Sequence, residues 1–214
     1  MGGSTVQGGL RAVAPPDLKL IETLRWEPGR GVRRRDLHLA RLAAGCAALG
    51  IPYPDAGTLL DGVAEEVALR LRLTVDLSGR MELTPSPLGP GATSWSVMFA
   101  DERLESDAPW LRLKTTERAV HEHARANLPD GVDEAIFLNE RGELCEGTIT
   151  NLFLERHGTL LTPPVSSGCL PGVLRRALLE EGVAQETVIR PEDLADGRLY
   201  LGNSLRGLIA AAVV

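Results

Sequence analysis

Lys114 is the side chain of this sequence best suited to covalent chemistry. It stands in LRLKTTER (111–118), directly after an alternating, half-apolar run that predicts a strand ending at the lysine. Burial at a strand end lowers the pKa of an amine, and the neutral amine attacks a carbonyl to form a Schiff base. Lys19 is the only other lysine, whereas arginine supplies nearly all of the positive charge. The alternative is an ordinary solvated lysine in a turn, the commoner place for this residue type.

Three segments that could bind a ligand follow Lys114 in the chain. Glu146, in CEGTITNLF (145–153), lies between a turn and a strand, where a carboxylate can hold a protonated ring nitrogen. SSGCLPGVLRR (166–176) predicts a helix start, and the free N–H groups of a helix start attract phosphate. YLGNSLRGL (200–208) places small hydrogen-bonding residues at the end of a strand. Each segment taken alone also fits an ordinary turn, strand or helix start.

His38 and Arg41 lie three residues apart on a predicted helix, so their side chains share one face. A solvated helix face is the usual explanation of such a pair. The cysteines are an odd number and lack the spacing of metal ligands, which predicts free thiols in a reducing cytoplasm and no metal site. They are Cys46, Cys145 and Cys169.

Apolar periodicity and turn residues predict the elements that must position these groups. A strand is expected over 17–26, and a helix from about 37 to 49 with Asp36 as its cap. Thr115 or Thr116 is expected to cap a helix that ends at 126, and Pro171 to stand in the first turn of the last helix. The other expected elements are a helix over 56–69, strands over 71–77, 81–84, 94–99, 135–139 and 148–154, an irregular stretch over 101–113, and a buried strand over 208–214.

Composition narrows the class of protein. Acidic residues outnumber basic ones by 29 to 23, and the resulting net charge of −6 argues against nucleic acid as a partner. A small anionic ligand remains compatible, because a few local arginines suffice to bind it. No apolar run has the length needed to cross a bilayer, so no membrane partner is expected. Residues 1–16 are interpreted as a flexible lead-in rather than a signal peptide, which predicts a cytoplasmic protein.

The order of these segments resembles the class IV aminotransferase family, the fold-type IV enzymes that use pyridoxal 5'-phosphate (PLP). The resemblance covers about residues 20–210, and its specificity lies in the order and spacing of motifs that are weak singly. In chain order the motifs are ETLR (22–25), HLARL (38–42), the lysine, EGTITNLF (146–153), LPGVLRR (170–176) and GNSL (202–205).

By this resemblance, Lys114 is the catalytic lysine that bonds the cofactor, and Glu146 pairs with the pyridine nitrogen. Arg41 binds the cofactor phosphate. The other cofactor-binding residues that the resemblance implies are the backbone N–H groups of Gly172 and Val173 and the side chains of Ser204 and Asn203 at the phosphate, with Asn151 near the ring.

The resemblance also implies the fold and the assembly. It implies an α/β fold of the α+β type, with two lobes and the active site between them. The first lobe is expected over 1–100 and the PLP-binding lobe over 113–214, joined by an interdomain segment over 101–112. A homodimer is implied as well.

The cofactor leaves the reaction open, since one fold can run both transamination and elimination. Many family members begin with a longer segment that holds a YGDG run, whereas here only a Gly/Ala/Pro-rich lead-in precedes Leu18. The short start and the NSLR turn resemble the lyase-type members. They imply an aminodeoxychorismate lyase that forms 4-aminobenzoate and pyruvate for folate synthesis. The alternatives are a branched-chain or D-amino-acid type aminotransferase, and a non-catalytic protein that has kept the fold.

A lyase of this type must bind the carboxylates of a small anionic amine substrate. Arg206, directly after the GNSL turn, is the preferred substrate-binding residue, because its neighbours are expected at the cofactor phosphate. Arg25 and Arg112 are lesser candidates, and for both a solvated arginine is the preferred explanation.

Overall fold

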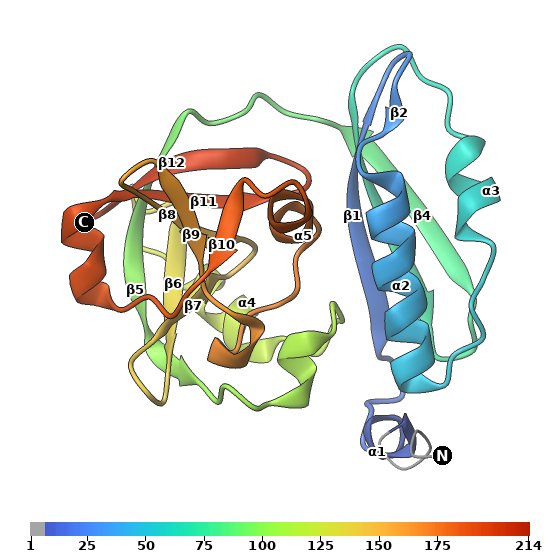
Figure 1. Cartoon of the computed structure of the whole chain (residues 1–214). Coiled ribbons are helices and arrows are strands. Elements are labelled where there is room, and N and C mark those ends of the chain that lie inside the picture. Colours follow the sequence, from blue (N-terminus) through green and yellow to red (C-terminus); the bar gives the residue numbers. More distant parts are fainter. Residues whose placement is uncertain (1–6) are drawn as a thin grey trace. The chain divides into compact units, whose positions relative to one another are not determined.

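A computed structural model describes residues 7–214 and divides the chain into two compact units. The first unit contains the residues up to Gly89 and takes in the later segment Leu113–Glu117. The second unit contains Pro90–Arg112 and Arg118–Val214. Figure 1 shows the helices and strands of both units. The predicted mixed α/β fold is confirmed, with sheets and helices in both units.

The first unit is built on an antiparallel sheet with the strand order β2-β1-β3-β4. Strand β1 pairs with β3 over nearly its whole length, and its apolar residues Leu20, Leu24 and Trp26 alternate on the buried face. The strand bounds are β1 Lys19–Glu27, β2 Gly31–Val32, β3 Leu69–Asp76 and β4 Met81–Pro87.

Helix α2 (Arg35–Leu49) packs on β1 through a stripe that includes His38, Leu42 and Cys46. Gly45 lies on the same stripe and admits the Leu20 side chain, because a Cβ at position 45 would stand 2.8 Å from Leu20 Cδ2. Two short helices, α1 (Gln7–Ala12) and α3 (Ala56–Asp61), complete this unit.

The segment that holds Lys114 joins the first unit by pairing with β1. Thr115 forms an isolated antiparallel bridge with Leu20, and Ile21 N donates to Lys114 O at 2.8 Å. A 3-10 helix, Pro109–Arg112, comes directly before this segment. The prediction of a strand that ends at Lys114 is therefore wrong, because a 3-10 helix precedes the lysine. The backbone of Lys114 is instead held by long-range pairing with β1.

The second unit contains an eight-stranded sheet in the order β10-β9-β8-β11-β12-β5-β6-β7. Strand β7 also pairs with β8, so six of the strands form a closed ring and β9 and β10 extend it. The interior is filled by Val97, Ile136, Leu152 and Leu201, each fully buried. The bounds are β5 Ser94–Leu104, β6 Glu134–Asn139, β7 Leu144–Gly147, β8 Asn151–Arg156, β9 Thr159–Thr162, β10 Ala184–Glu186, β11 Arg198–Asn203 and β12 Gly207–Val213.

Two α-helices belong to the second unit within the described residues, α4 (Ala119–Ala126) and α5 (Val173–Glu180). Helix α4 follows the lysine segment and contacts β5 and β6. Helix α5 lies against β11, because Gly202 leaves space for Leu174: a Cβ at 202 would stand 2.9 Å from Leu174 Cδ2. The 3-10 helices Val165–Ser167 and Pro191–Asp196 lie in connections.

Several predicted helix limits are wrong. The helix expected over 56–69 ends at Asp61 with Gly62 as its C-cap, and from Leu69 onward the chain forms strand β3. Asp36 is not the cap of α2 but lies inside its first turn, where a negative charge is favourable. Helix α4 starts at Ala119, since Thr115 is used in the bridge to β1. Pro171 lies before the N-cap Gly172, two positions ahead of Val173, the first residue of α5.

The predicted strands are mostly confirmed, with three corrections at their ends. Strand β5 continues to Leu104 through an irregularity near Phe99, so the first part of 101–113 is not irregular. Strand β8 starts at Asn151, because the residues from Thr148 form a turn. Strand β12 is largely exposed rather than buried, and Ile209 is its buried residue.

The lead-in predicted over 1–16 forms helix α1 from Gln7, while residues 1–6 lie outside the described part. The lobe limits predicted from the sequence stay a prediction. No helix within residues 7–214 is long and apolar enough to pass through a lipid bilayer.

Candidate active site

Lys114 is half-buried beside the central strand of the first unit. Its backbone is fixed on both sides, since Ile21 N donates to Lys114 O at 2.8 Å and Thr116 N donates to Lys19 O at 2.9 Å. The side chain of the neighbouring Thr115 is buried. Because the backbone is fixed, the position from which the Lys114 side chain extends is fixed as well. This suits an amine that must reach one particular bonding partner.

Glu22 joins His38 and Arg41 in a buried cluster between β1 and α2. The Glu22 carboxylate contacts His38 Nδ1 at 2.6 Å and accepts from Arg41 Nε at 2.8 Å and Nη2 at 2.6 Å. The interpretation of His38 and Arg41 as a solvated helix face is wrong, because their side chains keep only 1% and 14% of their surface exposed. The strand that carries ETLR thus supplies the counter-ion for the helix that carries HLARL.

The electrostatics of this cluster follow from burial and the arginine. Burial alone would raise the pKa of Glu22, but the charge of Arg41 and the hydrogen bonds from His38 and Arg41 lower it from 4.5 to about 2. Burial lowers the pKa of His38 below its usual value, and Glu22 opposes that lowering only in part. Arg41 is therefore held, through two of its three guanidinium nitrogens, by a carboxylate that is ionised at neutral pH.

Glu146 lies where the ring of strands in the second unit closes, directly opposite Asn151 across the β7–β8 pairing. Its side chain keeps 8% of its surface exposed. Oε1 contacts His121 Nε2 at 3.0 Å, and Oε2 accepts from Leu170 N at 2.9 Å. His121 of α4 is thus the side chain of the second unit that pairs with Glu146.

Asn151 and Glu146 together hold the segment that leads into α5. Asn151 Nδ2 donates to Leu170 O at 2.9 Å, while Glu146 accepts from Leu170 N. Gly172 passes so close to Asn151 that a Cβ would stand 1.8 Å from its Oδ1, so a larger residue there would displace the Asn151 side chain. The segments EGTITNLF and LPGVLRR, separate in the sequence, are thus joined by side-chain contacts.

The first turn of α5 presents backbone N–H groups that no side chain caps. The Gly172 amide itself donates to Leu170 O at 2.8 Å, so it is used within the chain. Val173 is the first helical residue, and the amides of the first turn of a helix lack partners in their own helix. This arrangement favours an anion at the start of α5.

The turn between Glu146 and Asn151 is held by a fully buried carboxylate, Glu134 on β6. Glu134 accepts from Thr148 N at 3.0 Å and Ile149 N at 3.2 Å, and also from the Thr148 hydroxyl. It pairs with Arg125 of α4 at 3.6 Å. Glu134 therefore fixes the loop that separates the two strand-end residues.

The GNSL segment forms the turn between β11 and β12. Asn203 Oδ1 accepts from Leu205 N at 3.1 Å and Arg206 N at 3.0 Å, and its Nδ2 donates to Ile149 O at 3.1 Å. The Asn203 side chain thus shapes the turn and ties it to the Glu146 loop. Ser204 is buried beside it.

Arg206 is exposed at this turn, and its guanidinium carbon lies 5.7 Å from the centroid of the Trp95 ring on β5. A cation over an aromatic face is attracted to it. The other arginine candidates have partners nearby: Arg25 pairs with Glu27 at 2.6 Å, and Arg112 donates to Ser106 O at 3.5 Å.

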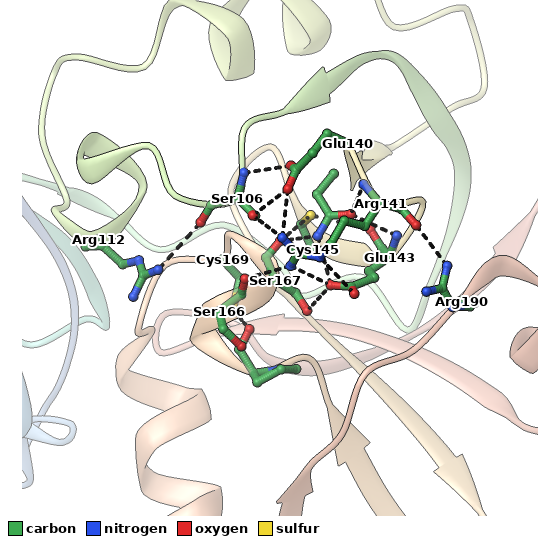
Figure 2. A network of polar contacts seen from close by, with 12 residues as sticks. Ser106, Arg112, Glu140, Arg141, Glu143, Cys145, Ser166, Ser167, Cys169 and Arg190 are labelled. Atoms are coloured by element: carbon green, nitrogen blue, oxygen red, sulfur yellow. Dashed lines mark hydrogen bonds and ion pairs between the residues drawn. The ribbon is translucent and has the colours of Figure 1, made fainter.

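A second polar network surrounds the turn between β6 and β7, shown in Figure 2. Arg141 donates to Glu143 from Nε at 3.0 Å and Nη2 at 2.8 Å, and Ser167 Oγ donates to the same carboxylate at 2.8 Å. The hydrogen bonds from Arg141 lower the pKa of Glu143 to about 2, although burial opposes them. This network fixes the 3-10 helix Val165–Ser167, from which the chain runs on to Leu170.

All three cysteines are buried free thiols, as predicted. Burial raises the pKa of Cys145 far above its usual value and that of Cys169 to about 12. A thiol that stays protonated is a poor nucleophile. The two thiols beside Glu146 therefore act as small packing groups.

The family model for class IV aminotransferases matches residues 19–214. The chain belongs to this family. Enzymes of the family are fold-type IV proteins that use PLP, so the chain is a PLP-dependent enzyme. The match includes every candidate residue described above, in both units.

Individual relatives of the family differ in the reactions that their names give. The chain is similar to the "Putative aminodeoxychorismate lyase" of Schizosaccharomyces pombe, with 25% identity over 83% of this chain and 82% of that protein. The structure is similar to the "Putative amino-acid aminotransferase" from Mesorhizobium loti, with 43% identity, coverage of 92% and 100% of the two chains, and a TM-score of 0.86. It is also similar to 4-amino-4-deoxychorismate lyase from Pseudomonas aeruginosa, with 27% identity, coverage of 100% and 88%, and a TM-score of 0.72.

The structure groups the predicted site residues of this PLP-dependent enzyme into two sets. The first unit holds Lys114 and Arg41. The second unit brings Glu146, Asn151, the start of α5 and the GNSL turn together through Leu170 and Ile149. Their roles stay predictions.

Sequence reasoning missed three residues that position the site, namely Glu22, Glu134 and His121. Glu22 stands in the quoted ETLR motif, which was the available signal. His121 shares one face of α4 with Ala124, a half-buried residue, and a lone histidine on an apolar face was the available signal there. No local pattern in the sequence indicates a role for Glu134, because its partners Thr148 and Ile149 lie beyond the next turn of the chain.

Proposed function

We propose that the protein is a PLP-dependent aminodeoxychorismate lyase, which converts 4-amino-4-deoxychorismate to 4-aminobenzoate and pyruvate. The observation that carries this proposal is the similarity to the S. pombe protein named for this activity, which extends over 83% of this chain and 82% of that protein. The similarity to the P. aeruginosa lyase, at 27% identity and over the whole of this chain, supports it.

Glu146 suits the ring nitrogen of PLP. The carboxylate is buried, and its partner side chain within the second unit is His121. A carboxylate has about four lone-pair sites, and the bonds from His121 and Leu170 use only two of them. A protonated pyridine would supply the missing positive partner and a further donor.

The start of α5 and Arg41 suit the phosphate. We propose the Val173 and Leu174 amides as donors, in place of the Gly172 amide that the sequence suggested, since that amide is used by Leu170 O. Arg41 adds charge through Nη1, the nitrogen that its ion pair with Glu22 does not use. The Ser204 hydroxyl is a further donor in this proposal, while Asn203 and Asn151 hold the surrounding backbone.

Lys114 is the proposed bonding amine and proton carrier. When bound, PLP draws electrons from the carbon that carries the substrate nitrogen, which makes that carbon acidic. Lys114 Nζ takes that proton once the substrate amine has replaced it, and later returns a proton to the departing product. Glu146 keeps the ring nitrogen charged throughout, so its role does not depend on which bond breaks.

Arg206 is the proposed partner of a substrate carboxylate. Its side chain is exposed and stacked near Trp95, so it can accept an anion without breaking an ion pair. Arg206→Ala is expected to raise the Michaelis constant by about tenfold, the value of one charge-assisted hydrogen bond, with little change in cofactor binding. Arg112→Ala, at an arginine that donates to Ser106 O, is the matched control.

The reaction is tested by supplying 4-amino-4-deoxychorismate to the purified PLP-loaded protein without any 2-oxo acid. The lyase proposal expects pyruvate and 4-aminobenzoate in equal amounts. The absence of both products, with PLP bound, would overturn the reaction and leave the cofactor proposal standing.

A second candidate is an aminotransferase, which the 43% identity to the M. loti protein favours. It predicts that a simple amino acid alone converts the bound PLP into its amine form, with loss of the visible absorbance near 400–430 nm. A 2-oxo acid would then restore that absorbance. The lyase expects neither change.

The bonding lysine is tested by reducing the holoenzyme with borohydride and mapping the labelled peptide. The label is expected on Lys114, and Lys114→Ala should abolish it. Lys19→Ala is the matched control, because Lys19 is the only other lysine and pairs with the exposed Glu82. Label on Lys19 would show the assignment to be wrong.

We also infer a cytoplasmic homodimer. Three buried free thiols suit a reducing compartment, and β12 and the residue after it present exposed apolar side chains at Leu208, Val213 and Val214. Sedimentation of the holoenzyme at twice the chain mass is the expected result.

A further inference from the structure

His121 and the Leu170 amide hold the Glu146 carboxylate from two elements that are far apart in the sequence. His121 Nε2 lies 3.0 Å from Oε1, and Leu170 N lies 2.9 Å from Oε2. The terminal torsion of a glutamate is soft and broad. A donor on each oxygen fixes the plane of the carboxylate, and with it the directions of the lone pairs that remain.

The His121 ring is itself fixed. It belongs to α4, its side chain keeps 10% of its surface exposed, and its centroid lies 4.8 Å from that of Phe137 on β6, at an interplanar angle of 54°. His123, two residues further along α4, is exposed and pairs loosely with Glu102 at 3.5 Å. The same helix therefore offers one histidine built into the core and one on its surface.

We propose that His121 is a positioning residue that aims the Glu146 carboxylate at the pyridine nitrogen of PLP. The proposal rests on the function proposed above, in which Glu146 binds that nitrogen. Burying a carboxylate is costly unless donors replace its water. His121 supplies one of the two donors and constrains the direction in which the anion can meet the ring.

A purely structural histidine would predict a different pattern. Its loss would lower the stability of α4 and its contact with Phe137, but a cofactor that still bound would keep the same protonation of its ring nitrogen. A positioning role instead links His121 to the state of an atom that His121 does not touch. The ring nitrogen is therefore the atom to observe.

The experiment uses the holoenzyme loaded with PLP that carries ¹⁵N in its ring. His121→Phe removes the donor and keeps an aromatic ring against Phe137, while His121→Asn keeps polarity but is too short to reach Glu146. His121→Gln is the conservative variant, because its amide nitrogen lies as many bonds from the backbone as His121 Nε2. His123→Phe is the matched control on the same helix.

The readouts are the ¹⁵N signal of the ring nitrogen, the dissociation constant of PLP, and the melting temperature of each variant. His121→Phe and His121→Asn are expected to shift the ¹⁵N signal toward the unprotonated position and to weaken PLP binding about tenfold, the value of one charge-assisted hydrogen bond. His121→Gln should restore most of both, and His123→Phe should change neither. If His121→Phe fails to fold, the pair His121→Asn and His121→Gln still makes the comparison.

The outcomes separate this inference from the proposed function. If Glu146→Gln shifts the ring signal and the folded His121 loss variants do not, the inference is overturned and the function stands. If Glu146→Gln also leaves the signal unchanged, or the wild-type protein takes up no PLP, the proposed function fails and the inference fails with it. A shift in the loss variants that His121→Gln reverses supports both.

Discussion

Two buried histidine–glutamate pairs, one in each unit, look alike and are completed differently. His38 contacts Glu22 at 2.6 Å, and His121 contacts Glu146 at 3.0 Å. Glu22 also forms two hydrogen bonds with Arg41, so its charge is balanced inside the chain. Within the second unit, Glu146 is held instead by its histidine and the Leu170 amide.

The difference indicates which kind of cation each carboxylate can pair with. A buried carboxylate with its own arginine orients that arginine, whereas one without a fixed cation can pair with a cation brought by a ligand. The same two residue types thus give a positioning device in one unit and a candidate binding group in the other. Mutations that remove one charge at a time test this distinction.

Replacing Glu146 by Gln should have the largest effect, and that effect should fall on catalysis. The neutral amide keeps the shape but not the charge opposite the ring nitrogen, so turnover is expected to fall by about 100- to 1,000-fold, as when one preorganised electrostatic partner is removed. The melting temperature should change little. A turnover within a few-fold of the wild-type value would remove Glu146 from the proposed mechanism.

Replacing Glu22 by Gln should act mainly on stability. It leaves Arg41 partly buried without its counter-ion, and breaking a buried ion pair in this way costs about 3 kcal/mol. Urea denaturation of the apoprotein measures this loss, and the PLP dissociation constant should rise as well because Arg41 is no longer held. If the Glu22→Gln variant is as stable as the wild type, Glu22 does not stabilise the fold through Arg41, and the distinction between Glu22 and Glu146 fails.

Acid should affect the wild type more than the Glu22→Gln variant. The pKa of Glu22 is about 2 in the folded chain against an ordinary value of 4.5, so its contribution is present above pH 4.5 and is lost as the pH falls toward 2. The difference in unfolding free energy between the two proteins should therefore shrink over this range, by on the order of 2 kcal/mol. Parallel stability curves for the two proteins between pH 6 and 3 would contradict the assignment.

Replacing Asn151 by Ala should give the smallest of these effects. It removes the bond to Leu170 O, worth about 1 kcal/mol of stability, and loosens the start of α5 that Glu146 holds from the other side. PLP affinity should fall a few-fold. An Asn151→Ala variant whose affinity falls as far as that of Glu146→Gln would mean that Asn151 touches the cofactor itself.

The sequence predicted the family and the fold class, because the order of the motifs along the chain is informative even where each motif alone is weak. The roles of the motif residues stay predictions. It predicted the strand around Glu22 and the helix around Arg41 from periodicity alone. It did not predict that these two residues meet, since a helical face shared by His38 and Arg41 looks the same whether water or Glu22 lies opposite.

Other errors arose where a distant part of the chain overrides local propensity. Thr115 has the chemistry of a helix cap, but pairing with Leu20 removes it from that position. The residues from Thr148 have β-branched side chains that favour a strand. They form a turn instead, because the Glu134 carboxylate accepts hydrogen bonds from the amides of Thr148 and Ile149. Helix periodicity and strand propensity do not contain these long-range contacts.

The first unit is built from two separate segments of the chain, and these segments are synthesised at different times. Its main sheet is complete when residue 87 leaves the ribosome, yet the segment with Lys114 arrives only after β5 of the second unit has been synthesised. A chain stopped at Gly89 would hold Arg41 and Glu22 but not Lys114, the proposed bonding amine. The two units therefore cannot be exchanged between homologues as simple cassettes, because any single crossover between 90 and 112 would pair one protein's sheet with another protein's lysine.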